Sequence, residues 1–357
     1  MKSRIKQGSK VLSLLLALAL ALCSMSFTAI ATAATQIDLS TSLYATNAPM
    51  LARQSYRPNP QTEYAKAFIE MCAGQTWLIN EVERLLNMEQ TTLDAVTGAG
   101  DFSNIRAIGL RDRSISGSIP RAIGELTELR FLWLSGNNLS GSIPAELFAL
   151  PNLEEIDLSG NRYTGAIPEG FGTMQSLARL ALGGNSFTGM IPETILTNTK
   201  ITLLNLEGNR LGDGSGLPAG IVGMTGLEYL NLSSNPWGSG AMPDLTRLNE
   251  LLSLSLWGCS MTGGIHSSTF ALNKLQILDL SDNSLSGEIP AGIGNLSSLE
   301  YLSLSSNRFT GSVPDAIEQL SKLRKLDLSG NGLSGLLPDV FGSPVLEEIH
   351  LGSNYWR

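Results

Sequence analysis

The sequence repeats itself about every 24 residues from position 105 to the end of the chain. One unit reads LRFLWLSGNNLSGSIP at 129–144, and an aliphatic residue opens each of eleven such units. These opening residues are Ile105, Leu129, Leu153, Leu177, Ile201, Leu227, Leu251, Leu275, Leu299, Leu323 and Leu346. A unit this short cannot bury its own hydrophobic side chains, so it stacks on copies of itself. The repeat therefore predicts an elongated solenoid in which each unit contacts its neighbours, and not a compact globular domain.

Within one unit, apolar and other residues alternate. Leu129, Leu132 and Leu134 lie at inward positions, while Phe131 and Trp133 point the other way. This period of two is typical of a short strand with one buried face. We expect the strands to stack in parallel and to line the concave side of an α/β solenoid of about eleven repeats.

Asparagine closes the strand segment in nine of the eleven units. An inward amide at this point can satisfy backbone groups exposed where the chain turns, so we predict a structural ladder with no role in binding. Arg113 and Cys259 replace asparagine in the first and seventh units. The ladder residues are Asn137, Asn161, Asn185, Asn209, Asn235, Asn283, Asn307, Asn331 and Asn354.

The second half of the unit carries a more specific motif, L-S/T-G-x-I-P. It is seen at 139–144, 163–168, 285–290 and 309–314. In this motif the chain resembles the plant-type subclass of the extracellular leucine-rich repeat family over residues 105–357. The resemblance implies a second short strand on a lateral face, followed by a 3₁₀ or helical turn on the convex side.

The segment before the repeats divides into three parts. Residues 1–33 have a basic start, an apolar run and the small-residue site Ala31-Thr32-Ala33, which together indicate a cleaved secretory signal peptide. An uncleaved membrane anchor is the alternative. Residues 34–60 are predicted to be a flexible linker, and residues 61–104 a helical N-terminal cap. This cap has Trp77 but lacks the cysteine pair of plant members, which favours a bacterial secreted or surface protein.

Charge and cysteine content limit the partners further. The net charge of −8 becomes −12 when the four basic residues of the signal segment are removed, so nucleic acid is a disfavoured partner. No other stretch has the length of a transmembrane helix. The remaining cysteines, Cys72 and Cys259, lie too far apart in a solenoid to form a disulfide.

The residues give little support for catalysis. Ser303, Asp327 and His350 fall in one column of the expected sheet, but serine and histidine are then two strands apart, about 10 Å. The acidic residues Glu155 and Asp157 share a strand face, which we interpret mainly as a solvated surface. No spacing suggests a metal site, and no glycine-rich loop suggests a cofactor site. We therefore expect no catalytic residues, no metal and no cofactor.

Binding is the function that remains. The informative positions on the concave face are those that depart from the routine serine, asparagine and aspartate, because exposed aromatic residues beside charges resemble recognition hot spots. Phe131 and Trp133 are the first candidates for contact with a partner; the alternative is a set of scattered surface aromatics with no ligand. The candidate residues are Phe131, Trp133, Glu155, Asp157, Arg179, Tyr229, Trp257 and Tyr301.

The predicted function is that of a secreted or cell-surface binding protein whose partner is a protein or, as the weaker alternative, a polysaccharide. Two other functions fit the same pattern: an inhibitor of a secreted hydrolase, and the ectodomain portion of a larger receptor or adhesin. Three N-x-S sequons, at Asn138, Asn231 and Asn295, would matter in a eukaryotic host alone.

Overall fold

The computed structural model describes residues 106–119, 121–338 and 345–357. The signal peptide (1–33), the linker (34–60) and the cap (61–104) lie outside the described residues. The described part forms two compact units. The first unit ends at Tyr163 and includes Met174–Leu177, and the second contains Thr164–Thr173 and Ala178–Arg357.

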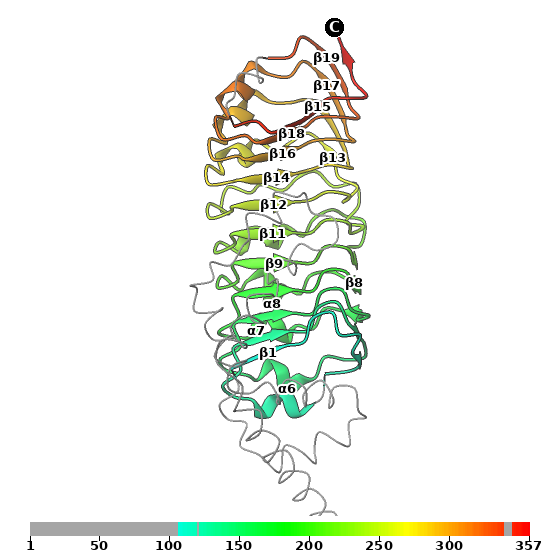
Figure 1. Ribbon diagram of the computed structural model, residues 1–357, viewed down its shortest axis with the longest axis vertical. Helices are drawn as coiled ribbons and strands as arrows, with labels where there is room; N and C mark the ends of the chain where they lie inside the picture. Colours follow the sequence, from blue (N-terminus) through cyan, green and yellow to red (C-terminus); the bar gives the residue numbers. More distant parts are fainter. Residues whose placement is uncertain (1–105, 120, 339–344) are drawn as a thin grey trace, which may run out of the picture. The chain divides into compact units, whose positions relative to one another are not determined.

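The strand segments of the repeats form parallel strands that follow one another in sequence order. The first unit contains β1 (Ala107–Gly109), β3 (Phe131–Trp133) and β5 (Glu155–Asp157). The second contains β7 (Arg179–Ala181), β9 (Leu203–Asn205), β11 (Tyr229–Asn231), β12 (Ser253–Ser255), β14 (Ile277–Asp279), β16 (Tyr301–Ser303), β18 (Lys325–Asp327) and β20 (Glu348–His350). Figure 1 shows β9 to β18 of the second unit as successive rungs. The predicted fold class, a solenoid of repeats with a parallel sheet, is confirmed.

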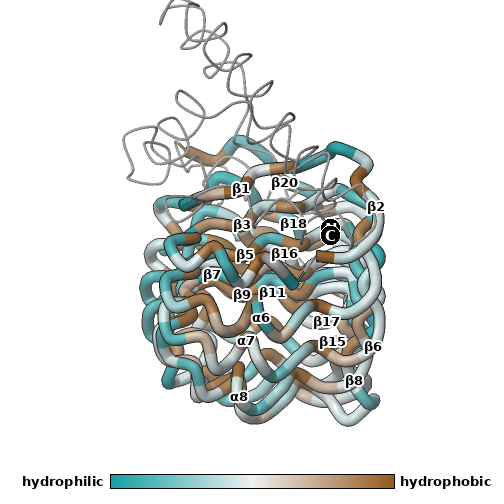
Figure 2. The backbone as a smooth tube through the Cα atoms, turned by 90° about the horizontal axis from the view of Figure 1, so that it is seen from below, coloured by the Kyte–Doolittle hydropathy of each residue, from teal (hydrophilic) through white to brown (hydrophobic). Residues whose placement is uncertain are grey.

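The core consists of the inward leucines of each repeat. Leu132, Leu204 and Leu254 lie in the middle of β3, β9 and β12, and all three side chains are fully buried. Each such burial contributes about 2 kcal/mol relative to an exposed side chain. Hydrophobic and hydrophilic stretches alternate along the chain (Figure 2). Below, the surface of the strands that faces away from these leucines is called the sheet face.

The register of the sheet-face strands equals the length of the repeat. Ala107 lies opposite Phe131, and Tyr301 lies opposite Lys325, in both cases a separation of one 24-residue repeat. Equivalent positions of successive repeats therefore form straight columns on the sheet face. A side chain at one position has its counterparts directly above and below it.

The L-S/T-G-x-I-P segments form a second set of short parallel strands beside the first. They are β2 (Ser116–Gly117), β4 (Asn138–Leu139), β6 (Thr164–Ala166), β8 (Ser186–Gly189), β10 (Arg210–Leu211), β13 (Thr262–Gly263), β15 (Ser284–Glu288), β17 (Arg308–Gly311), β19 (Gly332–Gly335) and β21 (Tyr355–Trp356). Their register differs from that of the sheet face. Ser286 lies opposite Arg308, a separation of 22 residues, so each lateral strand is displaced by two residues relative to the repeat.

A short helical turn follows the proline of most repeats, because a residue with fixed φ and no N–H is suited to a helix start. These turns are η2 (Arg121–Glu125), α6 (Ala145–Phe148), α7 (Gly170–Thr173), α8 (Glu193–Leu196), η3 (Ala219–Gly223), η4 (Ser267–Ala271), η5 (Ala291–Asn295) and η6 (Asp315–Gln319). The sixth repeat departs from this plan. No helical turn is found between Pro243 and Leu251. The insert Gly212–Gly216 of the fifth repeat is joined to the sixth repeat by an antiparallel bridge, Ser215 to Gly238.

The residue before the ladder position has a left-handed backbone in every repeat. Its φ lies between 51° and 69°, a region that glycine adopts without strain and that serine and aspartate adopt rarely. This explains why only these residue types are found there. They are Asp112, Gly136, Gly160, Gly184, Gly208, Ser234, Gly258, Asp282, Ser306, Gly330 and Ser353.

Candidate binding surface on the sheet face

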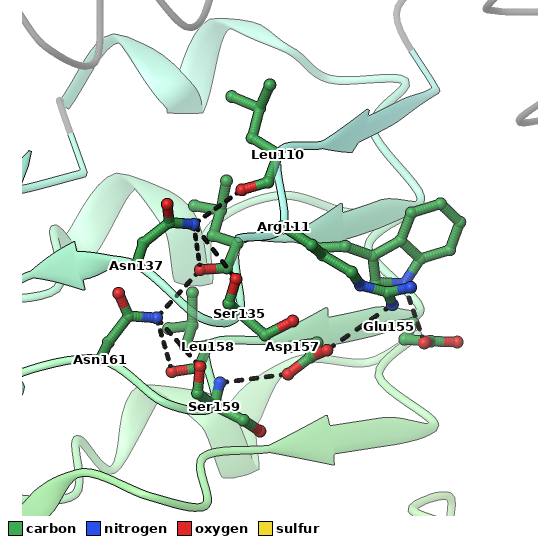
Figure 3. Close-up of polar contacts among 11 residues, drawn as sticks. Leu110, Arg111, Ser135, Asn137, Glu155, Asp157, Leu158, Ser159 and Asn161 are labelled. Carbon is green, nitrogen blue, oxygen red and sulfur yellow. Dashed lines mark hydrogen bonds and ion pairs between the residues drawn. The ribbon is translucent and has the colours of Figure 1, made fainter. Parts of the chain in front are cut away.

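The ladder asparagines join each repeat to the one before it. Asn137 Nδ2 donates to the carbonyl oxygens of Leu110 (2.7 Å) and Leu134 (2.9 Å), and its Oδ1 accepts the N–H of Ile115 (3.0 Å). Asn161 Nδ2 likewise donates to Leu134 O and Leu158 O (Figure 3). Its Oδ1 accepts the N–H of Leu139 at 3.0 Å. The other ladder amides donate to the carbonyl oxygen three residues earlier. These hydrogen bonds use up the polar atoms of the ladder side chains.

Cys259 takes the ladder position in the seventh repeat and replaces part of this network. Its Sγ lies 3.5 Å from Leu232 O and 3.6 Å from Trp257 O. A thiol offers no amide oxygen, and the N–H of Trp237 instead bonds to Asn235 O at 2.9 Å. Burial raises the pKa of the Cys259 thiol to about 12. The side chain is thus a buried, weak donor with a structural role.

The first unit contains a stack of aromatic and cationic side chains on its sheet face. The rings of Phe131 and Trp133 are stacked with centroids 5.5 Å apart and an interplanar angle of 18°. The guanidinium of Arg111 lies 5.0 Å from the Trp133 ring, and that of Arg130 lies 5.5 Å from the Phe131 ring. Arg111 belongs to the repeat before Trp133. Each ring therefore makes a cation–π contact in addition to the stack.

Carboxylates of the third repeat bind the polar groups of this stack. Trp133 Nε1 donates to Glu155 Oε1 at 2.8 Å, and Arg130 Nε donates to Glu154 Oε1 at 2.8 Å. Arg111 Nη2 lies 3.6 Å from Asp157 Oδ2 (Figure 3). Burial raises the pKa of Asp157, and this effect outweighs the lowering by Arg111 and by the N–H of Ser159. The two arginines and three acidic residues form a compact, charge-paired cluster.

The prediction that these aromatic and acidic side chains are exposed is wrong. Phe131 is 1% exposed, Trp133 7%, Glu155 7% and Asp157 0%. Arg111 and Arg130 lie over the rings, and Glu155 closes the indole edge. Asp157 also does not belong to a solvated strand face, because its Oδ1 accepts the N–H of Ser159 at 3.1 Å. What the sequence cannot show is that Arg111, 22 residues from Trp133, packs on this ring.

The candidate residues of the second unit are half-buried and lie on separate strands. Arg179 is in β7, Tyr229 in β11 and Tyr301 in β16, while Trp257 follows β12. Tyr229 and Tyr301 share a column, but the register places Ser253 and Ile277 between them. Three strand spacings of about 4.8 Å separate the two tyrosines. The structure therefore does not bring them together as one group.

Sequence reasoning missed a polar network on the sheet face of the second unit. Asn231 Nδ2 donates to Glu207 Oε2 at 2.8 Å, and the hydroxyls of Ser233 and Ser255 are 2.9 Å apart. All four side chains are buried. The signal was the clustering of polar residues at positions five and seven of neighbouring repeats. It is invisible without the register, because the paired residues are 22 or 24 positions apart.

Aspartates at the fifth position of a repeat bind the backbone two residues later. Asp279 Oδ1 accepts the N–H of Ser281 at 3.0 Å, and Asp327 Oδ1 accepts that of Ser329 at 2.9 Å. Asn205 and Asn231 make the same contact in their own repeats. Burial raises the pKa of Asp279 despite the hydrogen bonds from Ser281. The D-L-S pattern is therefore a turn-stabilising motif.

The structure places Asp327 between Ser303 and His350, as the sequence predicts. Ser303 lies opposite Asp327 and Asp327 lies opposite His350, so two strand spacings separate the serine from the histidine. The Asp327 carboxylate accepts from the hydroxyl of Ser329 at 2.6 Å. Among the residues that the structure describes, no group of three or more histidine, cysteine or acidic side chains is arranged to hold a metal ion.

His266 has a partner that the sequence did not reveal. Its Nδ1 lies 2.7 Å from Ser268 Oγ, and Ser268 Oγ also accepts the N–H of Leu245 at 2.8 Å. The histidine stands where other repeats have proline and caps η4, while Ser268 binds the backbone of the sixth repeat at Leu245. His266 and Ser268 are thus joined through the turn that begins η4.

Comparison with known families identifies the repeats. A leucine-rich repeat model matches residues 151–211, 249–309, 289–333 and 302–355, and a model of two such repeats matches residues 127–172. The chain belongs to the leucine-rich repeat family. No curated protein matches the sequence. No helix in the described part of this leucine-rich repeat chain combines the length and apolar character needed to cross a membrane.

Solved structures of plant receptors are similar to this leucine-rich repeat chain. The plant peptide hormone receptor RGFR1 in complex with RGF2 is 37% identical, with a TM-score of 0.65, over 71% of this chain and 40% of that chain. The ectodomain of the Arabidopsis receptor kinase HAESA, in complex with an IDA peptide hormone, is 35% identical with a TM-score of 0.67 over 71% and 42%. This chain thus spans about two fifths of the length of these ectodomains. A plant ice-binding protein is 26% identical, with a TM-score of 0.56, over 68% and 79%.

Proposed function

We propose that this chain is a non-enzymatic recognition module that acts outside the cell and binds a protein partner on the sheet face of its repeats. One contrast carries the proposal. The inward leucines are nearly invariant from repeat to repeat, whereas the third position of the repeat, which begins each sheet-face strand, changes character almost every time. In the first unit this column consists of Ala107, Phe131 and Glu155, and in the second of Arg179, Leu203, Tyr229, Ser253, Ile277, Tyr301, Lys325 and Glu348.

A scaffold needs only the leucines, the ladder and the turn residues, so a varied column needs another explanation. Varied aromatic and charged residues on a regular sheet are suited to recognition of one particular surface. The similarity to two receptor ectodomains that were solved with peptide hormones supports a polypeptide as the partner. The fold alone does not determine function, so this assignment rests on the column and on that similarity.

The charges of the sheet face favour a protein over a polyanion. Glu207, Asp279 and Asp327 lie on the sheet face of the second unit, and the chain as a whole is acidic. A nucleic acid would be repelled by these carboxylates. A polysaccharide remains the weaker alternative, since aromatic residues also stack on sugars.

The proposal is tested by comparing two faces of the same molecule. The Tyr229→Ala/Tyr301→Ala variant alters the sheet face, and Arg210→Ala/Arg308→Ala alters exposed residues of the lateral strands. The full chain, immobilised and exposed to proteins from the surface and medium of its native surroundings, is cross-linked and the captured species are identified. We expect the sheet-face variant to lose capture and the lateral variant to retain it.

Two results would contradict this assignment. Loss of capture in the lateral variant alone would place the partner on the lateral strands. Capture of a polysaccharide and of no protein would show that the partner is a polysaccharide. Inhibition of a pectin-degrading enzyme by the wild-type chain, but not by the sheet-face variant, would support the hydrolase-inhibitor alternative. Fractionation of the native cells tests the extracellular location.

A further inference from the structure

The described residues include four tryptophans, and their indole N–H groups do not behave alike. Trp133 Nε1 donates to Glu155 at 2.8 Å, Trp237 Nε1 to Leu232 O at 2.9 Å and Trp356 Nε1 to Leu351 O at 2.6 Å. Trp257 Nε1 is covered and has no hydrogen-bond acceptor among the described residues. A covered N–H without an acceptor is unfavourable, so this exception calls for a reason.

Trp257 lies at the seventh position of its repeat, on the sheet face of the second unit. Serine or glycine takes this position in most repeats, and Ser233 and Ser281 are its counterparts in the two adjacent repeats. The ring is half-buried, and the backbone N–H of Trp257 donates to Ser233 Oγ at 3.1 Å. The backbone is therefore anchored while a large aromatic surface remains partly open to solvent.

The acceptors near Trp257 already have donors of their own. Glu207 Oε2 accepts from Asn231, and the Ser233 hydroxyl pairs with that of Ser255. Asp279 accepts both the N–H and the hydroxyl of Ser281. The polar side chains of the neighbouring repeats thus form hydrogen bonds with one another and leave the Trp257 indole N–H without an acceptor in the described part of the chain. An acceptor supplied from outside the chain would complete the network.

The charges in this region select the kind of acceptor. Glu207 belongs to the fifth repeat and Asp279 to the eighth, so carboxylates lie on both sides of Trp257 in the seventh. A carboxylate or phosphate on a ligand would be repelled by them. A neutral carbonyl oxygen has no such penalty. The second torsion of a tryptophan side chain has two broad minima, so a half-turn of the ring would move the N–H away from its covered position to the other side of the ring.

We propose that the Trp257 indole N–H binds a main-chain carbonyl oxygen of a polypeptide held on the sheet face of the second unit. This inference rests on the proposed function, and it adds the residue and the ligand atom that fix the position of the partner. The indole ring would contact the same segment through its apolar surface. When the ligand binds, the ring turns. The indole N–H, which is covered and has no acceptor among the described residues of the free chain, then donates a hydrogen bond to the ligand.

The experiment uses the full chain and a random-peptide library displayed on phage. Peptides selected on the wild-type chain are measured against Trp257→Phe, which keeps an aromatic ring and removes the N–H. The matched control is Trp356→Phe, the same change at a half-buried tryptophan whose N–H bonds internally. In ¹⁵N-labelled protein, the Trp257 indole signal is identified by its loss in Trp257→Phe and is followed as peptide is added.

We expect Trp257→Phe to bind the selected peptides about five- to tenfold more weakly and Trp356→Phe to bind as the wild type does. The Trp257 indole signal should shift and become protected from exchange. Equal binding by Trp257→Phe, with an unmoved indole signal, would overturn this inference and leave the proposed function standing. Failure of the wild-type chain to bind any peptide would refute the proposed function itself. A shift caused by neutral oligosaccharides, and not by peptides, would overturn the polypeptide assignment.

Discussion

The Cys259 thiol lies 3.5 Å from the carbonyl oxygen of Leu232, the same pairing that Asn283 makes with Leu256 in the next repeat. In both pairs the accepting carbonyl belongs to the residue 27 positions before the donor. Asn283 also accepts the N–H groups of Cys259 and Met261, a task for which a thiol sulfur is only a weak acceptor. At Cys259 the seventh repeat is therefore joined to the sixth by a weak thiol hydrogen bond, in place of the amide hydrogen bonds that the ladder asparagines make.

This difference predicts unequal costs for alanine at two ladder positions. Asn161→Ala should lower the free energy of unfolding by about 2–4 kcal/mol, because Leu139 N loses its acceptor and three carbonyl oxygens each lose one hydrogen bond. Cys259→Ala should cost about 1 kcal/mol or less, since a thiol is a weak donor. Urea unfolding of both variants measures the two values. If the two variants lose the same free energy of unfolding, the hydrogen bonds of the amide do not contribute to stability.

Alanine at Phe131 or Trp133 is expected to act first on stability. Both side chains are buried in the stack with Arg111 and Arg130, so each substitution should cost about 3–5 kcal/mol. Glu155→Gln is the matched mild change, because it keeps an acceptor for Trp133 Nε1 and should cost less than about 1 kcal/mol. Thermal unfolding followed by tryptophan fluorescence compares them. A fully stable Trp133→Ala variant would contradict the packing described here.

The raised pKa of Asp279 predicts a dependence of stability on pH. The folded chain takes up this proton before the unfolded chain does as the pH falls, so the unfolding free energy contributed by this group rises as the pH is lowered through the folded-state pKa. At neutral pH the buried carboxylate is a penalty that Asp279→Asn removes, so the variant should be more stable than the wild type there. Asn231 already makes the equivalent backbone contact, so asparagine fits. The advantage of the variant should shrink below neutral pH; a constant difference would refute the prediction.

Expression in a glycosylating host should distinguish two sequons. Asn295 is exposed at the end of η5, whereas Asn231 is buried and donates to Glu207. A glycan on Asn231 would break this bond and prevent the repeat from closing. Mass spectrometry of the folded, secreted chain should therefore find modification at Asn295 and none at Asn231. Folded protein carrying a glycan on Asn231 would argue against the sheet-face packing.

The leucines, the ladder asparagines and the glycines predicted the architecture because each makes its contact within its own repeat or the adjacent one. Leu132 has one place to go once the period is known, and Asn137 has backbone groups within reach on both sides. Such local rules can be read from a single sequence. They do not apply to the sheet-face residues that differ from repeat to repeat.

The burial of the sheet-face side chains could not be predicted from the sequence, because their environment depends on neighbours one repeat away. Phe131 and Trp133 alternate with leucines and so look exposed, but Arg111 and Glu155 cover them from the repeats before and after. Ser268 gives His266 a partner only because η4 turns the chain back. Identifying such pairs requires the register, which is 24 residues on the sheet face and 22 on the lateral strands.

The two-residue displacement of the lateral strands changes how this family of repeats should be compared and redesigned. Aligning repeats by their motifs matches Ser286 with Thr310, yet the residue beside Ser286 in space is Arg308. Glu288 likewise lies within 3.1 Å of where a side chain on Gly311 would begin, so the two positions constrain each other although no motif alignment matches them. Covariation or charge design on the lateral face would have to be carried out along this diagonal, whereas on the sheet face the motif alignment itself suffices.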